Sequence, residues 1–281
     1  AQMPAASSST SAGLPAMMWR TPWYMGLKRA EPSMRPRTGA RSQERRKRRA
    51  RTPSPLGRGL GRGTSPRAVG ERVLASSPIA RGRPIAHTPN TTNPNASHFL
   101  DVGCGAGNYS LKLLEKLPHR DVTLIDLSQP MLDRASERVR GVSNGRIHTH
   151  QADIRELKLG ENQFDIIMAA AVLHHLREEA EWTAVFQKFY RALKPGGSIW
   201  ISDLVTHTAE AIEQMMVARY GRYLTDLKDE AYRDHVFAYI AAEDTPRPLL
   251  FQIDLLRQVG FVKAEILHKN SVFAAFGAVK G

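Results

Sequence analysis

A glycine-rich turn directly after a short apolar run constrains the fold of this chain more than any other feature. The run at residues 99–102 leads into Gly103-Cys104-Gly105-Ala106-Gly107. Glycine tolerates a tight turn and lets a ligand approach the backbone closely, because it has no Cβ. The pattern predicts a strand, a turn and a helix that hold a nucleotide-like cofactor. A purely structural turn and a dinucleotide-binding turn would show similar residues, and both alternatives stay open here.

The stretches that follow the turn predict an α/β fold with a parallel sheet. Short apolar runs alternate with amphipathic stretches, which is typical of strands covered by helices. The predicted strands are residues 99–102, 122–125, 146–151, 164–169 and 198–202. The predicted helices are residues 107–116, 130–140 and 178–193, two more within 209–242, and one at 249–259. Two adjacent runs at the end, 262–267 and 272–279, predict an antiparallel edge hairpin.

The positive charge of the chain lies ahead of this region. The net charge is +13, yet residues 1–98 contain 18 Lys and Arg against 3 Asp and Glu, while residues 99–281 contain 22 against 24. The first segment is rich in Ser, Pro, Gly and Arg, and such a composition buries too little apolar surface to offset its chain entropy. The sequence predicts a disordered, basic, low-complexity leader over residues 1–96 and one folded domain over residues 97–281.

Four interpretations of the leader stay open. It can be a solvated tail without a specific role, or a wrongly assigned start or translated non-coding sequence fused to the domain. The basic run at residues 45–49 also suits RNA binding or nuclear import, and the Arg- and Ser-rich composition suits a transit peptide. Prolines at 78, 84, 89 and 94 interrupt the approach to the domain, so no helix is expected there.

Cysteine content and hydropathy limit the compartment. The single cysteine, Cys104, excludes an intrachain disulfide framework and a multi-cysteine zinc site, and it fits a reducing compartment. No run approaches the roughly 18 apolar residues of a spanning helix, and no secretory pattern is present. The sequence predicts a soluble, cytoplasmic protein with no metal site. Nucleic acid is expected as a partner only through the leader, and this partner is not favoured.

Two further acids follow predicted strands. Asp126 ends the second strand, where a carboxylate can accept both ribose hydroxyls of a nucleotide. Its alternative role is that of an acid near the helix N-terminus before Pro130. Asp153 and Ile154 follow the third strand, where the carboxylate can accept an adenine amino group and the isoleucine can cover one face of the ring.

Two histidines follow the fourth strand. His174 and His175 lie just past its carboxyl end, where ligands bind in open α/β sheets. Histidines also cap helices and bind carbonyl groups, so a functional and a structural role stay equally open. The last motif, Leu-Lys-Pro-Gly-Gly at 193–197, precedes the fifth strand and by itself predicts a structural turn.

Taken in order, these five elements resemble the class I S-adenosylmethionine (SAM)-dependent methyltransferases, with 101–107 and 193–197 as particularly close matches. The resemblance implies a Rossmann-like, seven-stranded, mostly parallel sheet with a C-terminal antiparallel hairpin. It also implies SAM as the cofactor and methyl transfer to a small-molecule or still unidentified acceptor. The cofactor-binding residues on this basis are Asp101, Gly103, Cys104, Gly105, Gly107, Asp126, Leu127, Met131, Asp153, Ile154 and Ala170.

Methyl transfer from a sulfonium depends mainly on orientation at close range, so a strong general base is optional. The candidates for the catalytic, acceptor-binding side are His174, His175 and Tyr220. There is no Asn/Asp-Pro-Pro-Tyr sequence after the fourth strand and no second cysteine, which disfavours amino-directed and C5-directed DNA methylation. Arginines that suit a small acidic acceptor, or that are merely exposed helix charges, are Arg222, Arg233 and Arg247.

Three other functions stay open. The C-terminal run 273–280 is also similar to the carboxy-SAM synthase group that takes part in modifying tRNA wobble uridine. A NAD-dependent oxidoreductase would share the glycine turn and the ribose acid, although Asp101 and the 193–197 turn disfavour it. In the resembled family, helices ahead of the first strand cover the sheet and the acceptor site. No such helices are expected here, and their absence would fit a non-catalytic SAM-binding protein.

Overall fold

The computed structural model describes residues 83–281, with side chains described from Thr88 onward. The predictions that concern residues 1–82, including the disorder and the possible partners of the leader, lie outside the described residues. Over the described part, no helix combines the length and the apolar character needed to cross a membrane.

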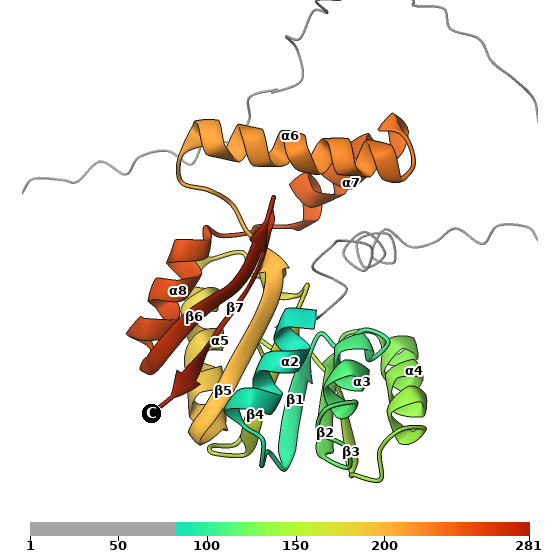
Figure 1. The fold of residues 1–281 in the computed structure, drawn as a ribbon, viewed down its shortest axis with the longest axis vertical. Helices are drawn as coiled ribbons and strands as arrows, with labels where there is room; N and C mark the ends of the chain where they lie inside the picture. The colour runs from blue at the N-terminus through green and yellow to red at the C-terminus, as the bar shows by residue number, and fades with distance from the viewer. Residues whose placement is uncertain (1–82) are drawn as a thin grey trace, which may run out of the picture. The chain divides into compact units, whose positions relative to one another are not determined.

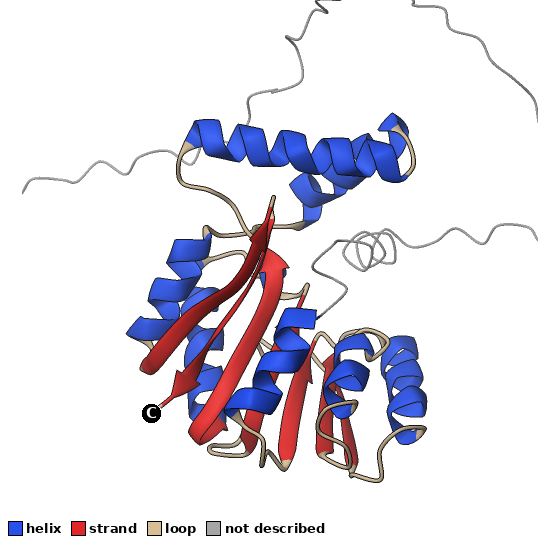
Figure 2. Cartoon of the chain, viewed as in Figure 1, coloured by secondary structure: helices blue, strands red, loops and turns tan. Residues whose placement is uncertain are grey.

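Seven strands form one mixed sheet in the order β3-β2-β1-β4-β5-β7-β6 (Figures 1 and 2). The first five strands in this order run parallel, β7 runs antiparallel to β5, and β6 runs antiparallel to β7. This arrangement confirms the predicted Rossmann-like sheet with its C-terminal hairpin. The strands are β1 (His98–Val102), β2 (Asp121–Asp126), β3 (Ile147–Gln151), β4 (Phe164–Ala170), β5 (Leu193–Leu204), β6 (Phe261–Asn270) and β7 (Phe273–Lys280).

Helices connect the strands and cover both faces of the sheet. They are α2 (Arg83–Thr92), α3 (Asn108–Leu114), α4 (Gln129–Arg140), α5 (Glu179–Ala192), α6 (Glu210–Leu227), α7 (Glu230–Glu243) and α8 (Leu249–Gln258), with one 3-10 turn, η1 (Leu173–His175), after β4. Local chemistry sets several ends: Glu178 and Glu181 form a reciprocal capping box at the start of α5. Likewise, Asp229 accepts a hydrogen bond from the Tyr232 N–H at the start of α7.

Helix α2 corrects the expectation that no helix precedes the first strand. It contains Pro89 in its interior, yet Asn93 directly after it anchors the segment to the sheet. The Asn93 side chain donates to the Gly196 carbonyl at 2.9 Å and accepts a hydrogen bond from the Ser198 hydroxyl at 2.5 Å. Tertiary contacts therefore outweigh the unfavourable local sequence, which the proline pattern alone cannot reveal.

Strand β5 also starts earlier than predicted. It begins at Leu193 instead of Ser198, so the Pro-Gly-Gly segment lies inside the strand. Leu193 pairs with Phe164, and the register then shifts before Ser198 pairs with Ile166. Gly196 takes a positive φ of 73° within this irregular segment, a conformation that glycine adopts without strain.

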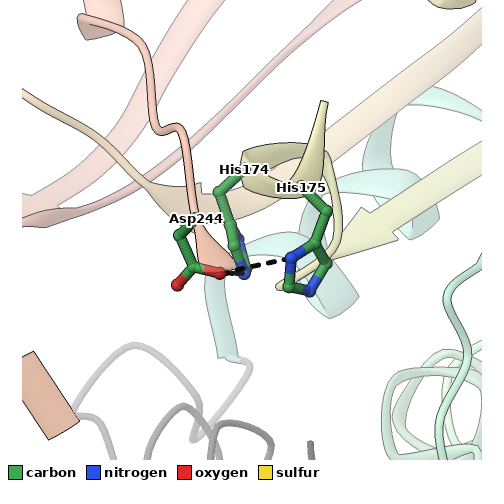
Figure 3. A group of neighbouring side chains, drawn as sticks. All are labelled: His174, His175 and Asp244. Atoms are coloured by element: carbon green, nitrogen blue, oxygen red, sulfur yellow. Dashed lines mark ion pairs between the residues drawn. The ribbon is translucent and has the colours of Figure 1, made fainter. Parts of the chain in front are cut away.

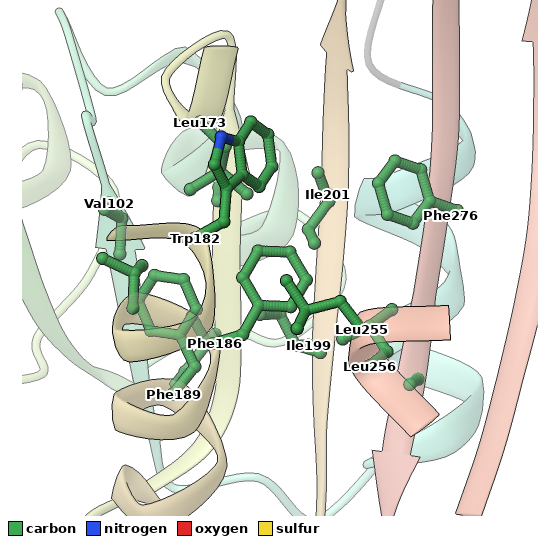
Figure 4. Close-up of a cluster of buried hydrophobic side chains, with 14 of the residues drawn as sticks. Val102, Leu173, Trp182, Phe186, Phe189, Ile199, Ile201, Leu255, Leu256 and Phe276 are labelled. Atoms are coloured by element: carbon green, nitrogen blue, oxygen red, sulfur yellow. The ribbon is translucent and has the colours of Figure 1, made fainter. Parts of the chain in front are cut away.

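Two apolar clusters hold the sheet between its helices. On one face, α5 contributes Trp182, Phe186 and Phe189, which pack against β4, β5 and α8 (Figure 4). On the other face, α3 and α4 pack against the sheet, and Tyr220 and Leu224 of α6 extend this second cluster at the end of β5. Side chains of the three α5 aromatics are almost completely buried, and neighbouring rings lie about 6 Å apart, with centroid distances of 5.9 and 6.4 Å.

Helices α6 and α7 lie at the end of the sheet where β5 finishes (Figure 1). The Ser271 hydroxyl, in the turn between β6 and β7, donates to the Met216 carbonyl of α6 at 2.6 Å. The Tyr220 ring of α6 meets the Phe273 ring of β7 edge-on, with centroids 5.2 Å apart. These contacts hold α6 against the β6–β7 turn, beside the carboxyl end of β5.

Replacing Phe186 by alanine should lower the free energy of unfolding by about 3–5 kcal/mol, because the ring is fully buried and its removal leaves a cavity. Urea unfolding of the full chain measures this change. Leu250→Ala on α8 is the matched control, since Leu250 is 60% exposed. We expect the control to change stability by less than about 0.5 kcal/mol. Similar losses for both variants would contradict the assigned core.

Candidate functional site

The glycine turn after β1 presents bare backbone at the carboxyl edge of the sheet. Gly103 and Gly105 have positive φ values of 64° and 50°. A Cβ built on Gly103 would lie 2.6 Å from a methyl carbon of Val172, so this glycine permits close packing of the turn after β4. A Cβ built on Gly105 would meet nothing within 4 Å. Gly105 therefore borders open space where a ligand can approach the main chain.

Asp126, at the end of β2, binds this turn directly. One carboxylate oxygen accepts the Gly105 N–H at 2.9 Å, and the other accepts the Ser128 N–H at 2.8 Å. The structure thus brings together two of the residues that the sequence assigned to the cofactor. A carboxylate offers about four acceptor positions, so Asp126 retains two for a ligand.

Asp101 lies one strand away and is almost completely buried. Burial raises the pKa of its carboxyl group to about 7. The Ser110 hydroxyl donates to this carboxyl at 2.6 Å and partly opposes the shift, while the nearby charge of Asp126 adds to it. A carboxyl group in this state can change its protonation near neutral pH.

Asp153 lies after β3 at the exposed side of the same edge. Both of its oxygens accept hydrogen bonds from the Arg155 guanidinium, which also binds Glu181 at 2.9 Å. The hydrogen bonds from Arg155 hold the pKa of Asp153 below its usual value. Its role toward an adenine ring stays a prediction, because the carboxylate is already occupied by Arg155.

The remaining predicted cofactor residues lie along the same edge in different environments. Gly107 packs against α4, where a Cβ would lie 3.2 Å from the Cβ of Ala135. Leu127 is 42% exposed, and Met131 is half-buried on α4. The buried members of this group are Cys104, Ile154 and Ala170.

His174 is held by a buried carboxylate that the sequence analysis did not single out. Asp203, near the end of β5, contacts the His174 Nδ1 and also accepts the backbone N–H of Leu173 at 2.7 Å. Burial lowers the pKa of His174, but the Asp203 charge and hydrogen bond outweigh it and raise the pKa overall. Burial raises the pKa of Asp203. The charge of His174 and the hydrogen bonds that Asp203 accepts outweigh burial, so the pKa of Asp203 lies below its usual value.

A second carboxylate faces both histidines. Asp244, directly after α7, places its Oδ1 3.2 Å from the His175 Nδ1 and 3.7 Å from the His174 Nε2 (Figure 3). The Thr245 N–H donates to the His174 carbonyl at 2.7 Å and so fixes the segment after α7 beside the turn after β4. No local sequence pattern indicated Asp244, because its partners lie about seventy residues away along the chain.

Tyr220 lies on α6, the helix that packs beside α7. Burial raises the pKa of its hydroxyl group, and the charge of Asp244 contributes. Its hydroxyl is buried and makes no hydrogen bond within residues 83–281. Of the predicted acceptor-side residues, His174 and His175 therefore face Asp244, whereas the Tyr220 ring packs against Phe273.

The three arginines that suited an acidic acceptor have different surroundings in the structure. Arg222 is exposed on α6, and the other two make contacts within the domain. Arg233 is paired with Asp234 at 2.8 Å and lies 3.7 Å from Glu230. Arg247 lies near the histidine segment, and one of its guanidinium nitrogens donates to the Arg177 carbonyl at 3.3 Å. Its Nε is buried and unbonded in the described region. Of the two, Arg247 is the better placed to meet an anionic group.

Comparison with known proteins matches the part of the chain that contains the glycine turn, Asp126 and the two histidines. A family model described as "Methyltransferase domain" matches residues 99–197. Phosphoethanolamine N-methyltransferase 1 of Arabidopsis thaliana is 32% identical over 149 residues, which cover 52% of this chain and 29% of that relative. Demethylmenaquinone methyltransferase of Lactococcus lactis is 24% identical over 187 residues, which cover 65% of this chain and 73% of that relative.

A solved structure shares the fold. Human N-acetylserotonin methyltransferase, solved in complex with SAM, aligns with a TM-score of 0.52 at 18% identity, over 77% of this chain and 58% of that chain. The chain spans less than a third of the length of the Arabidopsis relative, 29%. The family match begins with β1 and its glycine turn and ends at the Pro-Gly-Gly segment. Residues 99–197 thus match a methyltransferase domain, and the sheet around them has the strand order that the resemblance to class I SAM-dependent methyltransferases implied.

Proposed function

We propose that this chain is a SAM-dependent methyltransferase that acts on a small-molecule acceptor. The observation that carries the proposal is the open space at Gly105, bordered by the Asp126 carboxylate at the carboxyl edge of the sheet. Open α/β sheets bind nucleotide ligands at this position, where the strand order changes direction. Here that point lies between β1 and β4.

The residues present fit the parts of SAM. The unused acceptor positions of Asp126 suit two ribose hydroxyls, and the bare turn at Gly105 suits the methionine portion. Asp101 lies beneath this turn, and its ionised form would attract the ammonium group of that portion. Ile154 and Leu127 supply apolar surface for the adenine ring.

The acceptor side of the proposal consists of His174, His175 and Tyr220. SAM, when bound, supplies a methyl group that is attached to a positively charged sulfur, and this sulfur, as the leaving group, departs as a neutral thioether. The main contribution of the protein is then to hold the acceptor atom in line with this methyl group. Asp203 gives the His174 ring one fixed orientation for this task.

The acceptor class follows from the relatives and from the insertion between β5 and β6. The relatives are named for phosphoethanolamine and demethylmenaquinone, which are small molecules. Helices α6 and α7 lie over the acceptor side and leave Arg247 near it. We also infer that the catalytic domain includes α2 and Asn93 and therefore begins ahead of residue 97. The single cysteine suits the cytoplasm.

Replacing Asp126 by alanine should weaken SAM binding at least about tenfold, which corresponds to about 1.4 kcal/mol, because the ribose hydroxyls lose their acceptor. Calorimetric titration of the full chain measures the affinity for SAM and, in parallel, for NAD. Asp133→Ala is the matched control, since Asp133 is an exposed acid on α4.

We expect the wild-type protein and the Asp133 variant to bind SAM equally and to ignore NAD. Thermal unfolding without ligand shows whether the Asp126 variant is folded. An Asp126 variant that is folded and keeps full SAM affinity would contradict the cofactor assignment, and preferential NAD binding would contradict the enzyme class. Mass spectrometry of the ligand retained on purification would distinguish SAM from its carboxylated derivative.

The pKa of Asp101 predicts a pH-dependent stability. Since its pKa is raised to about 7 in the folded state, the folded protein holds an extra proton between about pH 4 and pH 7. The free energy of unfolding must therefore fall, on account of this group, as the pH rises through that range. Asp101→Asn removes this titration. The free energy of unfolding of the variant, relative to that of the wild-type protein, should therefore rise by about 2–3 kcal/mol between pH 5 and pH 8.

Urea unfolding at the two pH values measures this difference. Asp133→Asn serves as the control, because an exposed carboxyl has similar surroundings in the folded and unfolded states. We expect the control to show the same difference from wild type at both pH values. A pH-independent difference for Asp101→Asn would mean that the buried carboxyl titrates in its usual range.

A further inference from the structure

Three potential metal ligands from two distant segments meet at the acceptor side. They are the His174 Nε2, the His175 Nδ1 and a carboxylate oxygen of Asp244, and these ligand atoms all lie within 4.8 Å of one another (Figure 3). The histidines belong to η1, after β4, while Asp244 follows α7. The sequence predicted no metal site, since the ligands are too far apart along the chain to form a recognisable motif.

The distances match the requirements of a small divalent ion. Zinc binds histidine nitrogen at about 2.0–2.1 Å and carboxylate oxygen at about 2.0–2.2 Å, so tetrahedral ligand atoms are about 3.3–3.5 Å apart. The Asp244 Oδ1 lies 3.2 Å from the His175 Nδ1 and 3.7 Å from the His174 Nε2. The two distances from Asp244 thus lie within a few tenths of an ångström of those in a tetrahedral site, and the two imidazole nitrogens lie within 4.8 Å of each other.

We propose that His174, His175 and Asp244 bind a divalent transition-metal ion, with Zn²⁺ as its representative. A set of two imidazoles and one carboxylate suits zinc and its first-row neighbours, whereas Mg²⁺ prefers oxygen ligands throughout. Three protein ligands leave a fourth position of a tetrahedral site open, as in catalytic zinc sites. The side chain of His175 is 37% exposed, so this site can be reached from outside.

Asp203 supports the proposal from the second coordination shell. Its contact with the His174 Nδ1 favours a proton on that nitrogen and directs the lone pair of Nε2 toward Asp244. Histidines that bind metals commonly donate their other N–H group to a carboxylate in this way. Asp203 itself is fixed by the N–H groups of Leu173 and Leu204, at 2.7 and 2.8 Å.

The unbonded oxygen of Asp244 supplies an independent observation. The Asp244 side chain is only 2% exposed, and its Oδ1 accepts no hydrogen bond from any residue in the described range. A buried carboxylate needs a compensating charge. The His175 Nδ1 lies 3.2 Å away but outside hydrogen-bond geometry, and the His174 Nε2, at 3.7 Å, exceeds the length of an N–H···O hydrogen bond, which is about 2.7–3.2 Å. A cation among the three ligands would satisfy all of them.

The role of the ion rests on the proposed function, although its binding does not. A hydroxyl acceptor at the fourth position would release its proton to water at lower pH, because a bound metal stabilises the negative charge that remains on the oxygen. The His174 Nε2 would then serve as a ligand and would not accept that proton. Metal binding thus deepens the proposed function by favouring an oxygen-bearing acceptor.

Zinc titration of the tag-free full chain, after treatment with a chelator, tests the site. Competition with a chromogenic chelator measures affinity and stoichiometry, and Co²⁺ reports the geometry through its visible absorption. We expect one Zn²⁺ per chain and no competition from Mg²⁺. His175→Ala and Asp244→Ala should each weaken binding at least a hundredfold. Asp203→Asn, which removes a positioning residue, should weaken it by about 10–100-fold.

His235→Ala is the matched control, since His235 is an exposed histidine on α7, and it should leave zinc affinity unchanged. Circular dichroism and SAM titration of the same variants show whether each remains folded. Sub-stoichiometric zinc binding by the wild-type protein, or wild-type affinity in folded His175→Ala and Asp244→Ala variants, would overturn the site. Failure of the wild-type protein to bind SAM while it binds zinc would instead refute the proposed function alone.

Discussion

The buried carboxylate of Asp203 joins the end of β5 to the turn after β4, and the proposed acceptor side of the site depends on this contact. It accepts the N–H groups of Leu173 and Leu204 and contacts the His174 ring. Both side chains are shielded from water, so removal of either partner would leave the other without solvent or counter-charge. Such losses typically cost about 3–5 kcal/mol. The His174 ring is therefore fixed in one orientation, with its Nε2 toward Asp244.

The strand order brings the two halves of the site together. Because β1 lies between β2 and β4, the turns that leave β1 and β4 are neighbours at the carboxyl edge. Val172 packs so closely on Gly103 that no Cβ would fit there. This contact couples the cofactor turn to the turn that carries the histidines. Nothing larger than glycine at position 103 would keep both turns in place.

The sequence predicted the sheet and the cofactor half better than the acceptor half. Strand runs, the glycine turn and Asp126 are local patterns, and the structure brings Gly105 and Asp126 into direct contact. Asp203 could have been noticed, since it is an acid near the end of an apolar strand, as Asp101 and Asp126 are. Asp244 could not, because only the packing of α7 against the domain places it beside His174. The helix α2 was missed for a similar reason: its prolines disfavour it locally, and Asn93 holds the end of the segment from a distance.

The insertion between β5 and β6 has a consequence for the diversification of this fold. The matched family region ends at residue 197, before α6, α7 and the Asp244 segment begin. The proposed cofactor residues and the two histidines thus lie within the matched stretch, whereas Tyr220 and Asp244 follow it in the insertion. Changes within residues 205–248 can therefore alter the surroundings of the paired imidazoles while the glycine turn and Asp126 stay as they are.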